Sequence, residues 1–255
     1  MHRSGFVNIV GNPNVGKSTL MNALVGERLS IITSKAQTTR HRIMGIVNGD
    51  DFQIVYSDTP GVLKPNYKLQ EQMLEFSNSA LVDADILLYV TDVLVSFWHK
   101  ELPDAEIYPI SAQESFGVED LFERIKDLLP ECPPYFDKDQ MTDKPAKFFV
   151  TEIIREKILQ NYEKEIPYSV EVEVESFKEE DHLIRINAVI YVERDSQKGI
   201  IIGKQGKALK KVGTEARMDI ETFFDKKVFL QLFVKVDKDW RQKSGRLKHY
   251  GYDLN

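Results

Sequence analysis

Eight residues near the N-terminus have the types and the spacing of a phosphate-binding loop. Gly11 to Ser18 has the sequence GNPNVGKS, which fits the pattern G-x-x-x-x-G-K-[ST] in full. The glycines let the loop curl so that backbone NH groups point inward, and a helix that starts after the loop adds its dipole. Lys17 can then reach the β- and γ-phosphates of a nucleotide, and the Ser18 hydroxyl can bind Mg²⁺. The pattern therefore predicts a nucleoside-triphosphate site.

A second motif, Asp58-Thr-Pro-Gly61, follows the apolar stretch from Phe52 to Tyr56. An aspartate at the end of a strand can hold hydrated Mg²⁺, and the backbone NH of Gly61 can sense a γ-phosphate. Four such residues alone form a common β-turn. After a phosphate-binding loop, they predict a nucleotide-dependent switch in which Lys17, Asp58 and Gly61 are catalytic groups.

A third loop, Gly203-Lys-Gln-Gly206, has residues suited to a nucleic-acid backbone. Its glycines let backbone NH groups approach closely, and Lys204 and Lys207 can pair with phosphates. The loop follows an apolar run and opens a helix, which is the order of a type II KH domain. The alternative is an α+β domain with an exposed glycine turn. The RNA contacts that we expect are Lys198, Ile200, Ile202, Gly203, Lys204, Gln205, Gly206, Lys207, Lys210, Lys211 and Arg217. Ile200 to Ile202 form either a groove floor or core.

The distribution of charge along the chain agrees with a nucleic-acid site at the third loop. The chain has a formal net charge of -6, yet residues 194–248 contain 15 Lys or Arg and only 7 Asp or Glu. Such a run is either a solvated face or a surface for a polyanion, and the third loop favours the polyanion.

The elements that must position the first two loops lie in residues 1–130. We expect strands at 6–10, 43–47, 52–56 and 86–90, the last of them buried, and helices at 18–25, 69–82 and 118–129. Asn48-Gly49-Asp50 is a hairpin signal between two of the strands. Alternating strands and helices predict an α/β P-loop domain with a mostly parallel sheet, which binds ligands at the carboxyl ends of its strands.

The rest of the chain has a different order. Residues 131–145, with Pro130 before them, are rich in proline and lack apolar periodicity, so we expect a linker. Residues 146–255 predict an α+β type II KH domain, with helices at 146–161 and 208–224 and strands at 169–175, 183–192 and 228–236. A basic C-terminal tail follows. Its Trp240 and Tyr250 either stack on RNA or pack within the domain.

Composition excludes other classes of protein. No apolar run approaches the roughly 20 residues of a membrane-spanning helix, and the N-terminus lacks a signal-peptide pattern, so we expect a cytoplasmic protein. The single cysteine, Cys132, excludes an internal disulfide and a site with several thiolates.

GNPNVGKS, AQTTRHR at 36–42, DTPG and ISA at 110–112 together resemble the Era family, ribosome-assembly GTPases with a KH RNA-binding domain. The resemblance covers nearly the whole chain. It implies that Thr39, or its neighbour Thr38, meets Mg²⁺ and the γ-phosphate when the switch closes. Thr39 then joins Lys17, Asp58 and Gly61 as a catalytic group, and Ser18, Thr39 and Asp58 form the metal site. It also implies that the Ala112 NH touches the guanine carbonyl and that Asn14 recruits K⁺. The nucleotide contacts so implied are Gly11, Asn12, Pro13, Asn14, Val15, Gly16, Lys17, Ser18, Thr19, Asp58, Thr59, Pro60, Gly61, Val62, Ser111, Ala112 and Gln113.

The resemblance also implies partners. GTP and GDP are the expected ligands, and because Val62 rather than glutamine follows DTPG, we expect slow intrinsic GTP hydrolysis. The expected partner is RNA of the 3′ region of small-subunit ribosomal RNA, during assembly of the 30S subunit. We expect a monomer, and relatives suggest peripheral association with the inner face of the plasma membrane. Two alternatives are a P-loop ATPase that acts on nucleic acid and an RNA-binding protein with an impaired nucleotide site.

One part of the expected fold has no counterpart in the sequence. An Asn-Lys-x-Asp motif, which reads guanine in this family, is absent from all 255 residues. Between Val93 and Ser111 there is room only for one helix at 94–102 and a strand at 106–110. Family members would have about forty more residues between Val93 and Leu94, enough for a further helix and strand. We expect the intact protein to have that segment, since a true deletion would expose an interior strand and weaken base preference.

Overall fold

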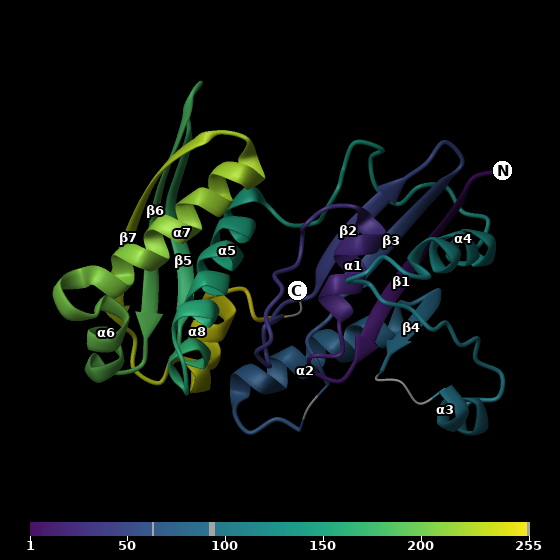
Figure 1. The fold of residues 1–255 in the computed structure, drawn as a ribbon, viewed down its shortest axis with the longest axis horizontal. Helices are drawn as coiled ribbons and strands as arrows, with labels where there is room; N and C mark the ends of the chain where they lie inside the picture. Colours follow the sequence, from purple (N-terminus) through teal and green to yellow (C-terminus); the bar gives the residue numbers. More distant parts are fainter. Residues whose placement is uncertain (63, 92–94, 254–255) are drawn as a thin grey trace. The chain divides into compact units, whose positions relative to one another are not determined.

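The computed structural model describes residues 1–62, 64–91 and 95–253. The chain divides into two compact units, which are described separately below. Unit 1 comprises residues 1–64 and 73–143, and unit 2 comprises residues 65–72 and 144–255. The expected site of the absent segment, at Val93 and Leu94, lies outside the described residues. Figure 1 follows the chain from its purple N-terminus to its yellow C-terminus.

Unit 1 is built on a four-stranded sheet of order β2-β3-β1-β4. Its strands are β1 (Arg3–Gly11), β2 (Ile43–Asn48), β3 (Phe52–Asp58) and β4 (Ile86–Val90). β1 is parallel to both β3 and β4, while β2 forms the predicted hairpin with β3. Ile9 of β1 pairs with Asp58 at the end of β3. The phosphate-binding loop and DTPG therefore leave the sheet side by side, because parallel strands end at the same edge.

Four helices accompany this sheet. They are α1 (Lys17–Val25), α2 (Lys68–Val82), α3 (Val95–Glu101) and α4 (Val118–Leu128). α2 begins in unit 2 and ends in unit 1. α1 packs on β1, β2 and β3, and α4 buries Val118, Leu121 and Ile125, which share one helical face. Gly45 of β2 allows α1 to approach, since a Cβ there would lie 2.7 Å from a Val25 methyl group.

Strand β4 is not the buried strand that we expected. Its side chains alternate between partly buried and exposed, and Leu87 and Tyr89 are each about half exposed. Among the described strands β4 pairs only with β1, and Glu106 to Ile110 form no strand. An apolar cavity of about 230 Å³ lies beside it, lined by residues that include Leu88, Trp98 and Ile107. A strand with one neighbour cannot bury both faces, which explains the error.

The proline-rich segment 131–143, expected to be a linker, is part of unit 1 and packs on its strands. The buried Gln53 side chain accepts hydrogen bonds from the NH groups of Tyr135 and Phe136, at 2.7 and 3.0 Å. The ring of Tyr135 contacts that of Phe6, with centroids 4.8 Å apart. Composition indicated a segment without regular structure, and this holds, but one buried amide fixes its path.

Unit 2 has the α+β order that the sequence predicts. It contains α5 (Ala146–Asn161), β5 (Glu171–Glu179), β6 (Leu183–Val192), α6 (Asp195–Ile202), α7 (Lys207–Phe224), β7 (Lys227–Val236) and α8 (Ser244–His249), with 3₁₀ turns η1 (Ile166–Tyr168), η2 (Lys204–Gly206) and η3 (Trp240–Gln242). The sheet order is β5-β6-β7. β5 is antiparallel to β6, and β6 is parallel to β7.

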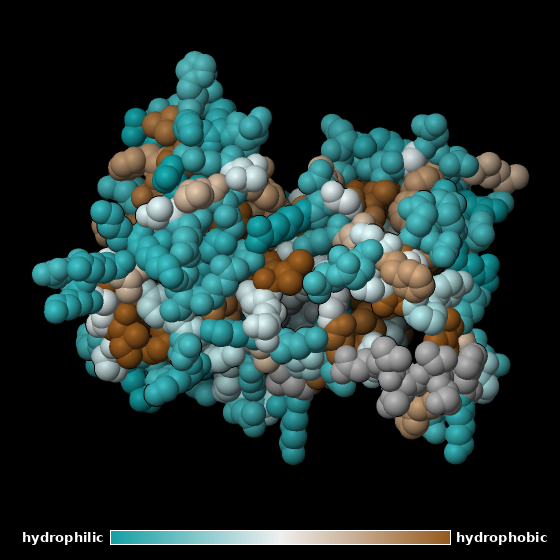
Figure 2. All heavy atoms as spheres, viewed as in Figure 1, coloured by the Kyte–Doolittle hydropathy of each residue, from teal (hydrophilic) through white to brown (hydrophobic). Residues whose placement is uncertain are grey.

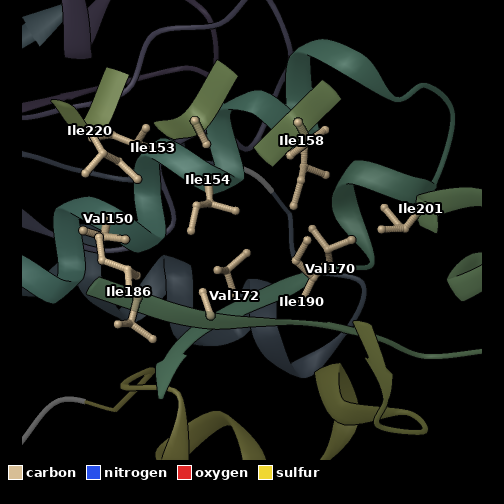
Figure 3. Packing of buried hydrophobic residues seen from close by; sticks show 14 of the residues in the cluster. Val150, Ile153, Ile154, Ile158, Val170, Val172, Ile186, Ile190, Ile201 and Ile220 are labelled. Carbon is tan, nitrogen blue, oxygen red and sulfur yellow. The ribbon is translucent and has the colours of Figure 1, made fainter. Parts of the chain in front are cut away.

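The core of unit 2 lies between its helices and one face of this sheet. Figure 3 shows Ile154 and Ile158 of α5 above Val172 of β5 and Ile190 of β6. The strand residues in this cluster alternate along the chain, as expected for strands that bury one face. The other face of the sheet is therefore free to contact the tail or a partner.

The C-terminal tail packs within unit 2. Trp240 is fully buried, and its Nε1 donates to the carbonyl oxygen of Ser169 at 3.0 Å. The Tyr250 hydroxyl donates to Asp237 at 3.0 Å. Of the two alternatives for the tail, the structure shows the packed one, which leaves Trp240 unable to stack on RNA. Among the described helices, none combines the length and the apolar character needed to cross a membrane.

Candidate nucleotide and RNA sites

The phosphate-binding loop connects β1 to α1 with positive φ angles at both of its glycines, 147° at Gly11 and 95° at Gly16. A side chain at Gly11 would be impossible, because a Cβ there would lie 2.2 Å from the carbonyl oxygen of Val90. Within the described residues no side chain caps α1. The NH groups at its start are therefore available to phosphate oxygens.

Lys17 lies buried at the base of this loop. Its Nζ donates to the carbonyl oxygens of Gly11 at 3.1 Å and Asn12 at 2.8 Å. Burial lowers the pKa of the Lys17 ammonium, while the nearby Asp58 carboxylate raises it. The loop thus holds a cation in place before any phosphate arrives, which is the arrangement that electrostatic stabilisation requires.

Three oxygen groups from distant parts of the sequence meet beside Lys17. The Ser18 hydroxyl donates to Asp58 Oδ2 at 2.6 Å, and the Thr39 hydroxyl donates to the same atom at 3.3 Å. The Ser18 and Thr39 oxygens are 2.9 Å apart. The neighbouring Thr38 hydroxyl instead donates to the carbonyl oxygen of Lys35 at 2.6 Å. Of the two candidate threonines, Thr39 is therefore the one beside Asp58.

The chemistry of this cluster fits a hard cation. Asp58 is fully buried, and its Oδ1 has no hydrogen-bond partner among the described residues. Burial raises the pKa of Asp58, although bonds from Ser18 and the charge of Lys17 oppose this. A cation would satisfy that oxygen. Within the described residues no three His, Cys, Asp or Glu side chains gather to bind a metal. Mg²⁺ held by one or two protein oxygens and by phosphates does not need such a group.

A cavity of about 150 Å³ extends from this cluster. Of the expected nucleotide contacts, Pro13, Asn14, Gly16, Lys17, Ser18, Thr19 and Gly61 line it, as does Thr39, an expected metal ligand. Gly61 lies so close to the loop that a Cβ there would come within 2.8 Å of Pro13. Asp58 lies just below, joined to the cavity through the Ser18 hydroxyl.

The rest of DTPG and its neighbour Val62 are tied to the same edge. The Thr59 hydroxyl donates to the Ile9 carbonyl at 2.7 Å, the Ser77 hydroxyl donates to that of Pro60 at 2.8 Å, and the Val62 NH donates to that of Gly11 at 3.3 Å. Ser111, Ala112 and Gln113, in contrast, do not line the cavity. Ser111 pairs with Phe116 in a small turn before α4.

Sequence patterns missed part of the cavity wall. Ile31, Ile32, Thr33, Ser34 and Gln37 also line it, as does Thr38, the expected alternative to Thr39. The Asn14 side chain donates to the Ser34 carbonyl at 3.2 Å, which holds this segment over the loop. The sequence signal for this part of the wall was weak: a polar stretch without periodicity between α1 and β2.

Arg42 was also missed, and it anchors the segment that contains Thr39. Its guanidinium makes two hydrogen bonds to Asp83, at 2.6 and 2.9 Å, and contacts the Ser57 hydroxyl at 3.0 Å. A bidentate pair of this kind restricts orientation more strongly than a single contact. Arg42 therefore fixes the C-terminal end of the segment to the sheet, three residues after Thr39.

Asp58→Asn should separate the role of Asp58 in Mg²⁺ binding from its effect on stability. The folded-state pKa of Asp58 is raised above its ordinary value of 3.8, so its contribution to stability is full below that value and is lost as pH rises towards the raised pKa. In chelator, the unfolding temperature of the wild type relative to the variant should therefore fall as pH rises from 3.8 through the raised pKa of Asp58. Thermal unfolding of both proteins across this series measures the difference.

The same comparison with Mg²⁺ and GDP supplies the control. Wild-type protein should gain stability from the metal and nucleotide together, whereas Asp58→Asn should gain much less. If, in chelator, the unfolding temperature of the wild type relative to Asp58→Asn rises with pH, this would contradict the prediction. It would show that the protein stabilises the ionised Asp58 carboxylate without a metal.

In unit 2, the loop Gly203–Gly206 forms a tight turn between α6 and α7. Gly203 and Gly206 have φ angles of 69° and 73°, and Gln205 has 55°. A Cβ at Gly203 would lie 2.6 Å from that of Ala208. Lys204 and Gln205 are exposed at its tip. Glycine is therefore needed for the turn, and the two side chains between are free to meet a ligand.

A groove of about 350 Å³ starts at this loop and runs between α7 and β7. Gly206, Lys210 and Arg217, all expected RNA contacts, line it, together with Leu209, Gly213, Thr214, Leu230 and Leu232, which the sequence patterns missed. Helical spacing from Gly206 could have identified the residues of α7. Lys211 does not share this groove and pairs with Glu215 on another face of α7.

In the apolar run before the loop, one residue belongs to the core, and none of the three isoleucines lines the groove. Ile201 is fully buried in the core, whereas Ile200 is half exposed. Figure 2 shows hydrophobic atoms over the region of α6 amid hydrophilic surroundings. Lys198 and Ile202 are partly exposed, and Lys207 is exposed at the start of α7.

Comparisons with known proteins agree with both units. Residues 6–124 match the family described as "50S ribosome-binding GTPase", and residues 165–241 match "KH domain". The chain is 41% identical to GTPase Era of Staphylococcus haemolyticus, over 98% of this chain and 97% of the relative. It is 43% identical to GTPase Era of Syntrophus aciditrophicus, over 99% and 96%. The first alignment has 291 positions, more than the 255 residues of this chain, so some positions of the relative have no counterpart here.

Two solved structures are similar over the whole chain. One is Era in complex with MgGDPNP and nucleotides 1506–1542 of 16S ribosomal RNA, with a TM-score of 0.94, 34% identity and coverage of 100% of both chains. The other is a variant of Aquifex aeolicus Era bound to GDP and AlF₄⁻, with the same score and identity and coverage of 99% and 100%.

The fold and the site define a class of protein: a P-loop nucleoside triphosphatase of the switch type, joined to a KH RNA-binding unit. At more than 40% identity over nearly its whole length to curated relatives, the chain belongs to the family of Era GTPases, enzymes that hydrolyse GTP. The expected family, the expected fold and the expected class of enzyme are thereby confirmed.

Proposed function

We propose that this chain is a GTP-dependent switch that binds the 3′ region of small-subunit ribosomal RNA and assists assembly and maturation of the 30S subunit. The meeting of Ser18, Thr39 and Asp58 supports this proposal most directly. Thr39 comes from the segment between α1 and β2, so nucleotide and Mg²⁺ would hold that segment by a contact that hydrolysis weakens. The relative solved with 16S ribosomal RNA supports the choice of RNA.

In the nucleotide site, each group has a distinct task. The backbone NH groups of Gly11 to Ser18 bind phosphate oxygens, and Lys17 places its charge against the developing charge of the transferred group. Mg²⁺, when bound, neutralises charge on the phosphates, and Ser18, Thr39 and Asp58 would hold it. Gly61 would offer its NH to the γ-phosphate. Val62, half exposed and without a hydrogen-bonding side chain, provides no base, so intrinsic turnover should be slow.

K⁺ is a further proposed cofactor. Asn14 lines the cavity, and its amide nitrogen faces the Ser34 carbonyl, which leaves the amide oxygen as a ligand for a cation. A monovalent cation there would supply positive charge beside the phosphates, where Val62 provides none. We propose a cytoplasmic monomer that associates with 30S particles, and peripheral binding to the inner face of the plasma membrane remains part of the same proposal.

Lys204→Asp with Gln205→Asp is expected to weaken RNA binding by at least tenfold, because it replaces a phosphate-pairing cation by two carboxylates at the tip of the loop. Both side chains are exposed, so the fold should be kept. Fluorescence anisotropy with a single-stranded RNA of the small-subunit 3′ sequence measures the affinity. Lys211→Asp is a matched control, since this exposed lysine lies on another face of α7. If both variants lose RNA affinity equally, the loop contributes no more to RNA binding than any other basic surface of α7.

A further inference from the structure

Strand β7 has two different sides. Leu230, Leu232 and Val234 face the helices and belong to the core or to the groove wall. Phe229 and Phe233 alternate with them and therefore point to the opposite face of the sheet, where they are 46% and 49% exposed. Two half-exposed phenylalanines on one edge strand are costly for a free surface, which suggests that something binds them.

The neighbouring strands add polar and cationic groups to the same face. Arg185 pairs with Phe229 across the strands, and its guanidinium lies 5.7 Å from the centre of that ring. Asn187 pairs with Gln231 in the next row. On the other side of Arg185, Lys178 of β5 is its cross-strand partner. We call these six residues the outer sheet patch: Lys178, Arg185, Asn187, Phe229, Gln231 and Phe233.

The C-terminal tail covers the opposite end of this face and reaches the cross-strand row that contains Phe233. The Tyr252 hydroxyl donates to Glu171 at 2.7 Å, and His249 lies 3.2 Å from Glu173. The ring of Tyr191 contacts that of Tyr250. All three of these contacts lie at the end of the sheet remote from Phe229. The tail therefore leaves uncovered the end of this face that carries Phe229 and Arg185.

The composition of the patch favours a nucleic-acid strand over an apolar protein partner. Its flat rings can stack on bases, its two amides can bond base edges, and its cations can meet phosphates. Lys178 and Arg185 are exposed, as is Lys227 beside them. Arg185 is paired with Glu180, but this is an exposed pair that a phosphate can replace.

The patch is also continuous with the RNA groove. Leu230 and Leu232 line the groove from one side of β7, and Phe229 and Phe233 lie on its other side. Because β7 is an edge strand of the sheet, a chain that leaves the groove has only to cross that edge. We propose that the outer sheet patch is a second contact for the single-stranded RNA held by the Gly203–Gly206 groove. This inference rests on the RNA-binding function proposed above.

Phe229→Ala with Phe233→Ala tests the proposal in the full chain. Stacking by each ring should be worth between about fivefold and a hundredfold in affinity. We therefore expect the double variant to bind a 12-nucleotide single-stranded RNA at least about tenfold more weakly than the wild type. A 5-nucleotide RNA of the same sequence, which fills little more than the groove, should bind both proteins equally, since a KH loop clamps about four nucleotides. Met218→Ala, which removes an exposed side chain of α7 outside the groove, is the control.

The outcomes separate this proposal from the one on which it rests. A loss confined to the 12-nucleotide RNA supports the patch. Equal binding of that RNA to wild type and double variant overturns it while leaving the groove intact. If the wild type binds neither RNA, the proposed RNA-binding function fails and the patch fails with it. Thermal unfolding of the double variant confirms that the fold is kept, as both rings are exposed.

Discussion

Lys17→Ala should lower GTP turnover by about a hundredfold to a thousandfold, which is the cost of removing one preorganised donor aimed at developing charge. The wild-type ammonium is already held by the carbonyl oxygens of Gly11 and Asn12, at 3.1 and 2.8 Å, so no reorganisation is needed when the phosphates bind. Its burial beside Asp58 strengthens its interaction with phosphate charge. Phosphate release at saturating Mg²⁺ and GTP measures the effect.

Two further variants make this result specific. Lys17→Arg keeps the charge but places a larger, planar group in a buried position, so it should also be impaired. Lys64→Ala removes an exposed lysine from the same unit and should hydrolyse GTP at the wild-type rate. Thermal unfolding without nucleotide distinguishes loss of catalysis from loss of fold. Turnover by Lys17→Ala within tenfold of the wild type would show that the loop amides and the metal suffice.

The structure brings together side chains that the sequence motifs place in one candidate site, because motifs of this kind encode geometry. Ser18 and Asp58 are 40 residues apart, yet both follow strands that are parallel neighbours, and parallel strands must end together. Thr39 was harder to choose over Thr38, since adjacent hydroxyls in a loop have no periodicity to distinguish them. Only the bond from Thr38 to Lys35 decides between them. Arg42 was missed because only tertiary packing brings its partner, Asp83, next to it.

Errors in the rest of unit 1 come from the environment of strands. Ile86 to Val90 is apolar throughout, which is typical of an interior strand, yet β4 is an edge strand among the described residues. The pattern fits a strand with two neighbours. Glu106 to Ile110 has the composition of a strand but no partner, and a strand without a partner cannot satisfy its backbone groups. Both errors concern the residues that flank Val93 and Leu94, where the sequence predicts that a segment is missing.

In unit 2, α5, α7 and the three strands lie close to the predicted ranges, because the strands bury one face with clear periodicity, whereas α6 was not predicted. The sequence did not predict which of the lysines faces the groove. Lys210 and Lys211 are adjacent in sequence but lie about 100° apart around α7, so only Lys210 faces the groove. Charge counts give a basic surface, whereas the helical phase decides which cation meets RNA.

Nucleotide competition should show that this chain prefers GTP to ATP by no more than about tenfold. A site that reads a base through paired hydrogen bonds discriminates by about 10⁴ to 10⁵. Here the sequence has no Asn-Lys-x-Asp motif, so no aspartate in that context accepts both guanine NH donors. What remains is the Ala112 NH, a neutral hydrogen bond worth about 0.5–1.5 kcal/mol. Displacement of a fluorescent guanine nucleotide by GTP, GDP, ATP and ADP measures the preference.

Inosine triphosphate is the matched ligand for this experiment, because hypoxanthine keeps the ring carbonyl of guanine and lacks its amino group. If only the Ala112 NH recognises the base, inosine and guanosine nucleotides should compete equally, and adenosine nucleotides slightly less well. Ser111 and Ala112 do not line the phosphate cavity, so their recognition of a base depends on the position of a small turn held by Phe116.

A preference for GTP above a hundredfold, with inosine triphosphate much weaker than GTP, would contradict this expectation. Such a result requires a carboxylate that accepts the two guanine NH donors, since a single neutral bond cannot supply that ratio. Weak discrimination would instead mean that the phosphates provide most of the binding energy, through Lys17 and the loop amides. Cellular GTP use would then depend on relative nucleotide concentrations. The open edge of β4 and the weak reading of the base would be two consequences of one shortened segment.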